Sequence, residues 1–411
     1  MQTSIEIPKP AEEIIETLNS HGFEAYAVGG CVRDSLLGKK PQDWDITTSA
    51  KPQEIKTVFG RTIDTGIAHG TVTIMRGKEG YEVTTYRIDG EYEDGRHPKD
   101  VTFTSNLEED LKRRDFTINA MAYHPKTGLI DIFEGIQDLE NKIIRCVGNP
   151  MDRFTEDALR ILRAVRFSAQ LGFTIESQTR EAIKTIAPNL IHISKERIQM
   201  ELTKLLLSNH PNYVKMVFEY GIASYISKTF ACIDPKQIAI GNDLPSIRHL
   251  RWAALLKHQD AKEAKTILKE LKMDNDTIAK AGLLVHWWKY PIGINELEVR
   301  KTMSQMTMDS YDDVLTLKES IQKNSSEMLE LPENQVQLER IRSLTNLIRS
   351  RGDCISLKTL ALTGADLITM GMKPGKAIGD SLNILLEVVL EHPDWNEKEK
   401  LKEVLSSLES V

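Results

Sequence analysis

The chain has 411 residues, of which 40% are apolar and 27% are charged, and its formal net charge is −7. At about 150 residues per domain, this length and composition predict two or three folded domains. The acidic balance argues against a protein coated in nucleic acid, although a local basic strip can bind a nucleic-acid backbone while the rest of the chain is acidic. No run reaches about 18 apolar residues, no basic-then-apolar signal opens the chain, and the 4 cysteines form no CxxC pair, so we expect no membrane span and a reduced, cytoplasmic compartment.

Strand-like and helical segments alternate over about the first 150 residues. Runs rich in Val, Ile, Thr and Tyr, broken by Gly, Asp and Pro, cover residues 25–30, 70–77, 81–88, 100–105 and 128–133. A helical segment at residues 11–22 precedes them and ends at Gly22. This mixture predicts an α+β or α/β head.

The rest of the chain has helical spacing almost throughout. Two stretches show it most clearly. In residues 196–207 the apolar set is Ile198, Leu202, Leu205 and Leu206, and in residues 381–392 it is Leu382, Leu385, Leu386 and Val389. Breaks between helical subdomains are expected near the prolines at 211, 235, 291 and 332. We therefore expect helices and no sheet beyond the head.

Two aspartates stand at the start of a β-branched run within the head. Asp43 and Asp45 are two residues apart, and alternate side chains of a strand share a face, so both carboxylates are expected to point the same way. Adjacent carboxylates repel unless a cation lies between them, and Mg²⁺ uses paired carboxylates when it also holds substrate phosphates. The pair predicts a magnesium site, with an acidic loop edge as the simpler alternative.

A glycine pair precedes these carboxylates. Gly29 and Gly30 follow a short apolar strand, where they allow a sharp bend and leave N–H groups for a phosphate, and Arg33 adds a charged donor. A plain tight turn explains the glycines alone, but the combination with the carboxylates favours a nucleotide site. Further along, Glu82 is either a third carboxylate that polarises the attacking hydroxyl or a solvent-facing strand residue.

The second group of polar residues is Arg113, Arg114 and Asp115, just before an apolar run. The arginines suit phosphate oxygens and the aspartate suits sugar hydroxyls, while a helix-start charge pattern is the structural alternative. The polar, turn-rich stretch 89–106 lies before them and predicts a loop or hairpin. A loop beside an active site can close on substrate, and the role of this one stays open.

Residues 155–167 predict an amphipathic helix capped by Thr155. At about 100° per residue, Asp157, Arg160 and Arg163 fall outside the apolar arc and Arg166 falls at its edge; the arc consists of Ala158, Leu159, Ile161, Leu162 and Val165. A salt-bridged polar face accounts for this pattern. The alternative is a base reader, since a carboxylate only accepts and a guanidinium only donates hydrogen bonds. Cytosine and adenine present an amino donor beside a ring-nitrogen acceptor, so such a pair suits C and A and rejects G and U.

In this order, the motifs resemble those of the class II tRNA nucleotidyltransferases, the CCA-adding enzymes, whose superfamily includes bacterial poly(A) polymerases. The matching motifs are GGCVRD, DWD, RRDFTINAMAY, EDALRILRAVRF and SKERIQMEL, at residues 29–34, 43–45, 113–123, 156–167 and 194–202. The resemblance implies an α+β protein. A polymerase-beta-like nucleotidyltransferase head with a small mixed sheet (1–148) would precede an all-α neck (149–222), body (223–330) and tRNA-binding tail (331–411).

The resemblance also implies an activity, which is template-independent addition of C, C and A to the tRNA 3′ end. CTP and ATP would be the substrates of a two-Mg²⁺ nucleotidyl transfer that releases pyrophosphate. Asp43 and Asp45 would bind Mg²⁺ as catalytic residues, and Glu82 is the candidate third carboxylate. The implied nucleotide-binding residues are Gly29, Gly30, Arg33, Arg114, Asp115, Asp157, Arg160, Arg163 and Arg166.

Other functions stay open at this point. A poly(A) polymerase or a partial CC- or A-adding enzyme fits the same motifs, and a silent RNA-binding module is a further alternative that the intact aspartates disfavour.

One residue separates His258 from Asp260, so we expect no second, phosphohydrolase site. The turn at 371–379 either offers Lys373 and Lys376 to tRNA phosphate or is a plain helix–turn–helix. The oligomeric state is open, a homodimer included.

Overall fold

The computed structural model describes residues 5–90, 101–324 and 333–409. The chain divides into two compact units, one of Met1–Lys236 with Lys269–Met273 and one of Gln237–Leu268 with Asp274–Val411. This division is coarser than the four predicted domains, whose boundaries stay predictions. Within the residues that the structure describes, no helix combines the length and apolar character needed to cross a bilayer.

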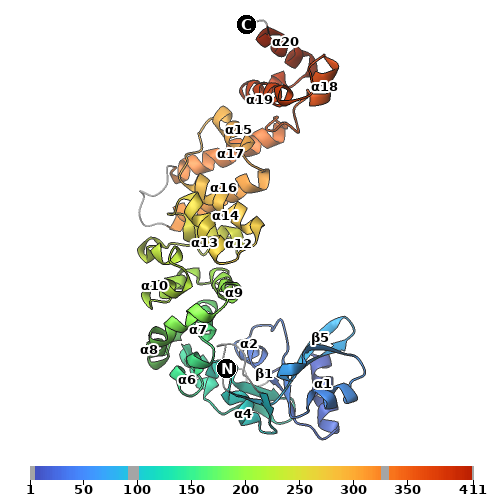
Figure 1. Cartoon of the computed structure of the whole chain (residues 1–411), viewed down its shortest axis with the longest axis vertical. Coiled ribbons are helices and arrows are strands. Elements are labelled where there is room, and N and C mark those ends of the chain that lie inside the picture. The colour runs from blue at the N-terminus through green and yellow to red at the C-terminus, as the bar shows by residue number, and fades with distance from the viewer. Residues whose placement is uncertain (1–4, 91–100, 325–332, 410–411) are drawn as a thin grey trace. The chain divides into compact units, whose positions relative to one another are not determined.

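All the described strands lie in the first unit (Figure 1). They are β1 Ala25–Val28, β2 Ile46–Thr48, β3 Thr62–Gly66, β4 Thr71–Arg76, β5 Glu79–Thr85, β6 Arg87–Asp89, β7 Val101–Phe103, β8 Met121–His124, β9 Gly128–Asp131, β10 Ile143–Ile144 and β11 Thr174–Ile175. The helices of this unit are α1 Lys9–Ser20, α2 Gly30–Leu36, α3 Pro52–Val58, α4 Leu107–Lys112, α5 Gly135–Asn141, α6 Pro150–Glu156, α7 Leu159–Leu171, α8 Ser177–Ile186, α9 Lys195–Leu206, α10 Lys215–Glu219 and α11 Ala223–Ile226.

The second unit is helical in its described part. Its helices are α12 Arg248–Leu256, α13 Ala261–Glu270, α14 Asn275–Trp288, α15 Glu296–Ser304, α16 Met308–Asn324, α17 Gln335–Arg351, α18 Gly364–Thr369, α19 Lys376–Glu391 and α20 Lys398–Glu409. The last two residues of α13 belong to the first unit.

The head is built on one mixed sheet, which confirms the predicted α+β fold. The sheet has 7 strands in the order β3-β4-β5-β2-β1-β8-β9. Only β2 and β5 pair in parallel, and the other neighbours are antiparallel. The strand β2, which follows the two aspartates, is therefore central and has β1 on one side and β5 on the other.

Helix α1 covers part of this sheet through an apolar stripe. Ala11, Ile14, Ile15 and Leu18 follow helical spacing, and each is fully buried. The helix ends at Ser20, and Gly22 takes a left-handed φ of 86° where the chain turns into β1. The predicted helix and its glycine stop are confirmed.

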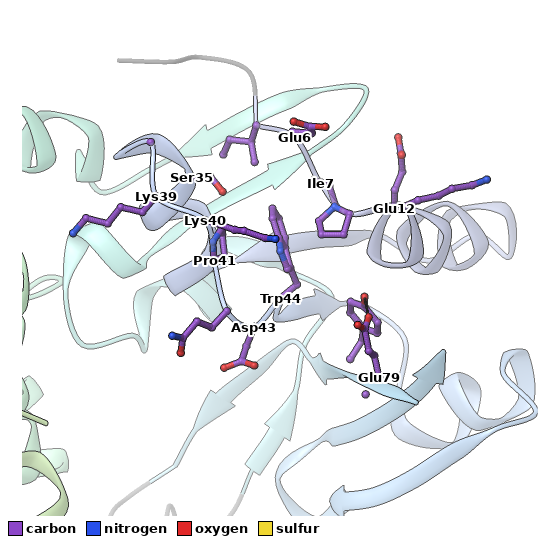
Figure 2. Close-up of a pocket in the computed structure, with 17 residues that line it drawn as sticks. Glu6, Ile7, Glu12, Ser35, Lys39, Lys40, Pro41, Asp43, Trp44 and Glu79 are labelled. Carbon is purple, nitrogen blue, oxygen red and sulfur yellow. Dashed lines mark hydrogen bonds between the residues drawn. The ribbon is translucent and has the colours of Figure 1, made fainter. Parts of the chain in front are cut away.

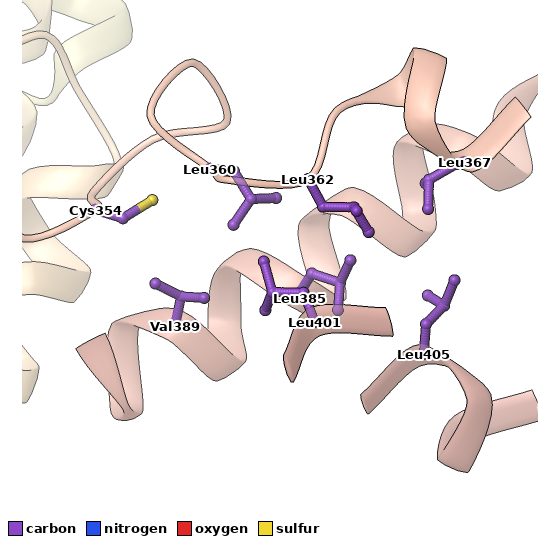
Figure 3. Packing of buried hydrophobic residues seen from close by; sticks show 8 residues of the cluster. All are labelled: Cys354, Leu360, Leu362, Leu367, Leu385, Val389, Leu401 and Leu405. Carbon is purple, nitrogen blue, oxygen red and sulfur yellow. The ribbon is translucent and has the colours of Figure 1, made fainter. Parts of the chain in front are cut away.

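The helical spacing seen in the sequence also corresponds to helices. In α9, Ile198, Leu202, Leu205 and Leu206 are buried. In α19, Leu385 and Val389 are fully buried and pack with Leu401 of α20 and Leu367 of α18, as Figure 3 shows. The C-terminal helices thus have an apolar core of their own.

Three expectations need correction or delimitation. Thr155 does not cap a helix, because it lies inside α6 and donates its hydroxyl to the Met151 carbonyl at 2.8 Å. The region expected to be all-helical contains the short strand β11, which pairs in parallel with β10. Most of the predicted loop 89–106, namely residues 91–100, lies outside the described residues, and so does Pro332; the flanking strands β6 and β7 pair as an antiparallel hairpin.

Candidate active site

The two carboxylates of the predicted magnesium site lie immediately before β2. Asp43 and Asp45 are exposed, whereas Trp44 between them is only 8% exposed. The Asp45 carbonyl accepts a hydrogen bond from Val28 N–H at 3.0 Å, which ties this segment to β1. The alternating exposure places both carboxylates on the solvent side of an extended segment.

Glu82 lies beside this pair on β5. The parallel register of β2 and β5 puts Asp45 and Glu82 at neighbouring positions at the same end of the two strands. The pKa of the Asp45 carboxyl is raised because the surrounding protein removes part of its hydration and because Glu82 and Asp43 repel its charge, while Arg114 opposes the shift. The strand ends therefore gather negative charge that a cation would relieve.

The carboxylate pair fits Mg²⁺ better than a metal that needs a full protein cage. Among the described residues, no group of three or more His, Cys, Asp or Glu side chains is arranged to hold a metal ion. Mg²⁺ keeps several of its waters and takes one or two carboxylates together with substrate phosphates. Asp43 and Asp45 supply that set, and Glu82 acts on it through its charge.

The glycine turn before α2 is in close contact with two arginines. Gly29 has φ 82°, and a side chain there would come within 3.1 Å of Nη1 of Arg114. Arg33 of α2 approaches the second glycine, with its Nη2 3.7 Å from where a Cβ on Gly30 would lie. Arg33 also donates to Asn119 Oδ1 at 2.6 Å. The Gly29 N–H is donated to the Met121 carbonyl at 3.2 Å, so the donors that converge at this turn for an anion are the Gly30 N–H and two guanidinium groups.

Asp115 connects this turn to helix α7. It accepts hydrogen bonds from Arg163 Nε at 2.7 Å and from Asn119 Nδ2 at 3.1 Å. Burial alone would raise the pKa of Asp115, but Arg163, Asn119 and Arg160 outweigh it and hold that pKa well below its usual range. Asp115 is therefore ionised, and its arginine partner comes from the predicted base-reading helix.

The base-reading segment differs from the prediction. Asp157 was expected on the same helix as Arg160, but α6 ends at Glu156, α7 begins at Leu159, and Asp157 lies between them with an extended backbone (φ −143°, ψ 103°). The Asp157 carboxylate accepts the Leu159 N–H at 2.9 Å, so Asp157 caps α7. The apolar arc of α7 is buried as expected, and it includes Ile161, Leu162 and Val165.

The two residues expected to read the base each have a partner of their own. Asp157 accepts a hydrogen bond from Arg197 of α9 at 2.7 Å. Arg160 donates to Glu156 at 2.7 Å. The Asp157 and Arg160 side chains are therefore held by two separate ion pairs, one with Arg197 of α9 and one with Glu156 of α6.

Three arginines of the predicted nucleotide site surround one aromatic ring. The guanidinium carbons of Arg33, Arg163 and Arg166 lie 5.1, 5.4 and 3.9 Å from the ring centre of Phe167. Arg166 is 6% exposed and forms an ion pair with the buried Glu201 of α9. Cation–π contacts and this ion pair fix the orientation of the cluster.

Sequence reasoning missed four side chains that organise the site. Asp110 pairs with Arg113 and Arg114, and Asn119 links Arg33 to Asp115. The signal for Asp110 was its spacing of three and four residues before two arginines, which is ion-pair spacing on a helix. The other two, Arg197 and Glu201, lie in the fourth motif, but no local signal identified their partners.

One of the cavities in the head lies beside the carboxylate pair. It measures about 1140 Å³ and is lined by residues 5–9, the segment between α2 and β2, and the start of β5. Figure 2 shows Asp43 and Trp44 on that segment. Asp43 lines this cavity, whereas the arginine cluster described above does not.

Comparison with known families covers most of the chain. A "Poly A polymerase head domain" model matches residues 25–145, a "Probable RNA and SrmB- binding site of polymerase A" model matches 172–232, and a "tRNA nucleotidyltransferase domain 2" model matches 246–405. The match over the head spans the carboxylate pair, the glycine turn and Arg114 with Asp115. The match over 172–232 includes α9 and its partner residues Arg197 and Glu201.

Individual relatives agree along nearly their full length. The chain is 37% identical over 410 residues to a CCA-adding enzyme of Lacticaseibacillus paracasei, with 97% of this chain and 96% of the relative covered. It is 38% identical over 408 residues to a CCA-adding enzyme of Ligilactobacillus salivarius, with 96% and 95% covered. The crystal structure of the Bacillus stearothermophilus CCA-adding enzyme in complex with CTP superposes with a TM-score of 0.79 at 31% identity over 98% of each chain. The chain therefore belongs to the CCA-adding enzymes of the class II tRNA nucleotidyltransferase/poly(A) polymerase family.

Proposed function

We propose that this chain adds C, C and A stepwise to the 3′ end of tRNA from CTP and ATP, and that its own side chains choose the nucleotide. Addition of CCA to tRNA is the activity of the family to which it belongs. The single observation that supports the proposed mechanism best is the convergence of the carboxylate pair, the glycine turn and Arg114. Arg114 acts electrostatically on Asp45 and lies against Gly29.

The chain itself mainly binds and orients the substrates. Asp43 and Asp45 would hold Mg²⁺, which supplies Lewis-acid activation of the tRNA 3′-hydroxyl and charge neutralisation of the triphosphate when bound. The Gly30 N–H and the guanidinium of Arg114 bind triphosphate oxygens, while the Gly29 N–H is donated to the Met121 carbonyl at 3.2 Å. Fixed donors of this kind stabilise the charge that grows on the pyrophosphate leaving group without reorganising.

The ribose is held by a second set of partners. Asp115 is ionised, and Arg163, Asn119 and the Phe116 N–H already donate to its two oxygens, so a sugar hydroxyl binds there by sharing or displacing one of these donors. Because Asn119 also binds Arg33, the sugar and phosphate contacts are joined by one side chain. Sugar binding at Asp115 therefore places the α-phosphate relative to the carboxylate pair.

Base choice falls to Asp157 and Arg160. Asp157 uses one oxygen to cap α7 and the other to bind Arg197, and a carboxylate has further lone pairs that accept from an amino group. Arg160 keeps N–H groups beyond the three bonds that it donates, and these suit a ring-nitrogen acceptor. The pair thus retains the hydrogen-bonding capacity that favours C and A.

The decisive experiment is incubation of the full chain with tRNA that ends at the discriminator nucleotide. CTP alone is expected to add two nucleotides, and CTP with ATP three, in a reaction that stops when Mg²⁺ is chelated. A long adenosine ladder would indicate a poly(A) polymerase instead, and addition that stops after C and C with both nucleotides present would indicate a partial enzyme. Mg²⁺-dependent pyrophosphate release separates all of these from a silent RNA-binding protein.

A variant of Asp43 tests the metal site directly. Asp43→Ala is expected to abolish incorporation while the melting temperature stays close to that of the parent, because the side chain is exposed. Asp64→Ala is the matched control, since Asp64 is a carboxylate of the same sheet that pairs with Lys56 on the surface. Full activity of Asp43→Ala would remove the metal assignment.

A further inference from the structure

Asp110 is a fully buried carboxylate to which the proposed mechanism gives no part. It lies in α4 with 0% exposure. Its Oδ1 accepts two hydrogen bonds from Arg113, from Nε at 2.9 Å and Nη2 at 2.7 Å, and its Oδ2 accepts one from Arg114 Nη2 at 3.2 Å. One buried negative charge thus lies between two guanidinium groups.

The same carboxylate is joined to β2, the strand that directly follows the proposed metal-binding pair. The Thr47 hydroxyl of β2 lies 3.0 Å from Asp110 Oδ2 and 3.3 Å from the Thr84 carbonyl of β5. A hydroxyl donates one proton, and the shorter, charge-assisted contact is the one to Asp110. Asp110 is therefore anchored two residues beyond Asp45 on β2.

A second connection runs from this cluster to the base-reading helix. The Arg113 carbonyl accepts a hydrogen bond from Arg160 Nη2 at 3.0 Å. Because Asp110 binds the side chain of Arg113 in two places, it limits the movement of that residue relative to Arg160. The side chain of Asp110 therefore links β2 to Arg113 and Arg114, and through Arg113 to the proposed base-reading residue Arg160.

Arg114 is the group that this arrangement orients. Its Nη2 is bound to Asp110, and its Nη1 lies against the glycine turn, 3.1 Å from where a Cβ on Gly29 would lie. Its Nε is buried and has no hydrogen-bond partner within the described residues. A buried guanidinium N–H without a partner is costly, so this donor marks a place where a ligand oxygen would complete the site.

We propose that Asp110 is a positioning residue for the triphosphate. Its carboxylate holds Arg114, the proposed triphosphate contact, at a fixed place between the glycine turn and β2. This inference rests on the proposed function, because it takes Arg114 to be a triphosphate contact. A buried charge cluster contributes little net stability, because the cost of desolvation offsets much of the attraction. Stability alone therefore does not explain this cluster, whereas orientation of Arg114 does. Arg114 without its partner would have many orientations, and nucleotide binding would have to select one of them.

The first test measures KM and kcat for CTP and ATP in Asp110→Asn. The amide keeps the size of the side chain and loses the charge, so both KM values are expected to rise about tenfold, the effect of weakening one charge-assisted hydrogen bond. We expect kcat to change less than KM. An unchanged KM would overturn the inference.

A double-mutant cycle with Arg114→Gln separates orientation from simple support of the fold. If Asp110 acts through Arg114, Asp110→Asn raises KM in the parent but not in the Arg114→Gln background. Equal increases in both backgrounds would overturn the inference alone. If Arg114→Gln leaves KM unchanged, both the proposed nucleotide site and the inference are wrong.

Two further variants protect the test against loss of folding. Asp110→Glu keeps the charge and moves it by one methylene group, so it is expected to raise KM less than Asp110→Asn; a KM raised as much as in Asp110→Asn would contradict the role of the charge. Glu333→Gln is the matched control, because Glu333 is 2% exposed and forms a buried ion pair with Lys318 at 2.8 Å in the second unit. It is expected to lower the melting temperature and leave KM unchanged.

Discussion

At the level of single residues, the site is held by carboxylates that are buried beside arginines. Asp115 is 8% exposed and accepts hydrogen bonds from Arg163, Asn119 and the Phe116 N–H. Loss of hydration opposes its ionisation, and the positive partners more than compensate, so its pKa is lowered. Its charge therefore contributes to stability as well as to the proposed ribose contact.

Because the charge of Asp115 stabilises the fold, the free energy of unfolding of Asp115→Asn is expected to differ from that of the parent by an amount that depends on pH. A carboxyl whose folded pKa is depressed stabilises the native state above its unfolded pKa of about 3.9 and loses that contribution as the pH falls through the folded value. We expect Asp115→Asn to lower the free energy of unfolding at pH 7, and the difference from the parent to shrink below about pH 4. Denaturant unfolding between pH 7 and pH 3 measures it.

A control carboxylate defines the background of that experiment. Asp64→Asn changes an exposed side chain whose ion pair with Lys56 is on the surface, so it is expected to change stability little at any pH. A difference for Asp115→Asn that stays constant down to pH 3 would contradict the lowered pKa.

At the level of elements, the sequence predicted several helices and strands because their signals are local. Apolar periodicity located α9 and α19, and β-branched runs located β1, β4 and β5. These patterns reflect burial of one face, which each segment carries in its own residues. The same reasoning failed for the helix expected over 155–167, because Thr155 lies inside α6 and the chain breaks between Glu156 and Leu159.

The reason for that failure is a contact between distant segments. Asp157 leaves the helix, caps α7 through the Leu159 N–H and pairs with Arg197, which lies 40 residues further along the chain. Spacing along one helix does not reveal such a partner. For the same reason the sequence predicted which residues form the candidate site but not how Asp110, Asn119 and Glu201 connect them, because each contact depends on the tertiary fold.

The break between the helices leads to a prediction for Asp157→Asn. Asparagine also accepts the Leu159 N–H, so α7 stays capped and the melting temperature is expected to stay close to the parent value. The amide adds donors and removes the charge, so the preference for CTP over UTP is expected to fall at least about tenfold. Single-nucleotide incorporation with each triphosphate measures it.

The matched control for this variant is Asp152→Asn, an exposed acid in the first turn of α6. It is expected to leave nucleotide preference unchanged. An unchanged preference in Asp157→Asn itself would show that Asp157 does not read the base and serves only to cap α7.

At the level of the whole molecule, the formal charge of −7 conflicts with binding to a polyanion unless positive charge is local. In the first unit, Arg33, Arg163 and Arg166 surround Phe167. In the second unit, Lys373 lies in the turn before α19 and Lys376 is the first residue of that helix; both are exposed, and Gly375 precedes the helix without a side-chain cap. The sequence left two alternatives for this turn, a contact with tRNA phosphate and a plain helix–turn–helix.

The salt dependence of tRNA affinity distinguishes these two alternatives. Each phosphate contact releases counterions, so the logarithm of affinity falls linearly with the logarithm of salt concentration, by about 0.7–0.9 per contact. If both lysines contact phosphates, Lys373→Ala with Lys376→Ala is expected to weaken binding and to reduce this slope by about 1–2. Binding measured from about 50 to 200 mM salt gives both quantities. The control is Lys358→Ala, which changes an exposed lysine of the same unit. A slope in the double variant equal to that of the control would exclude the turn as a phosphate contact, because the slope depends on the number of phosphate contacts and not on the nucleotide sequence.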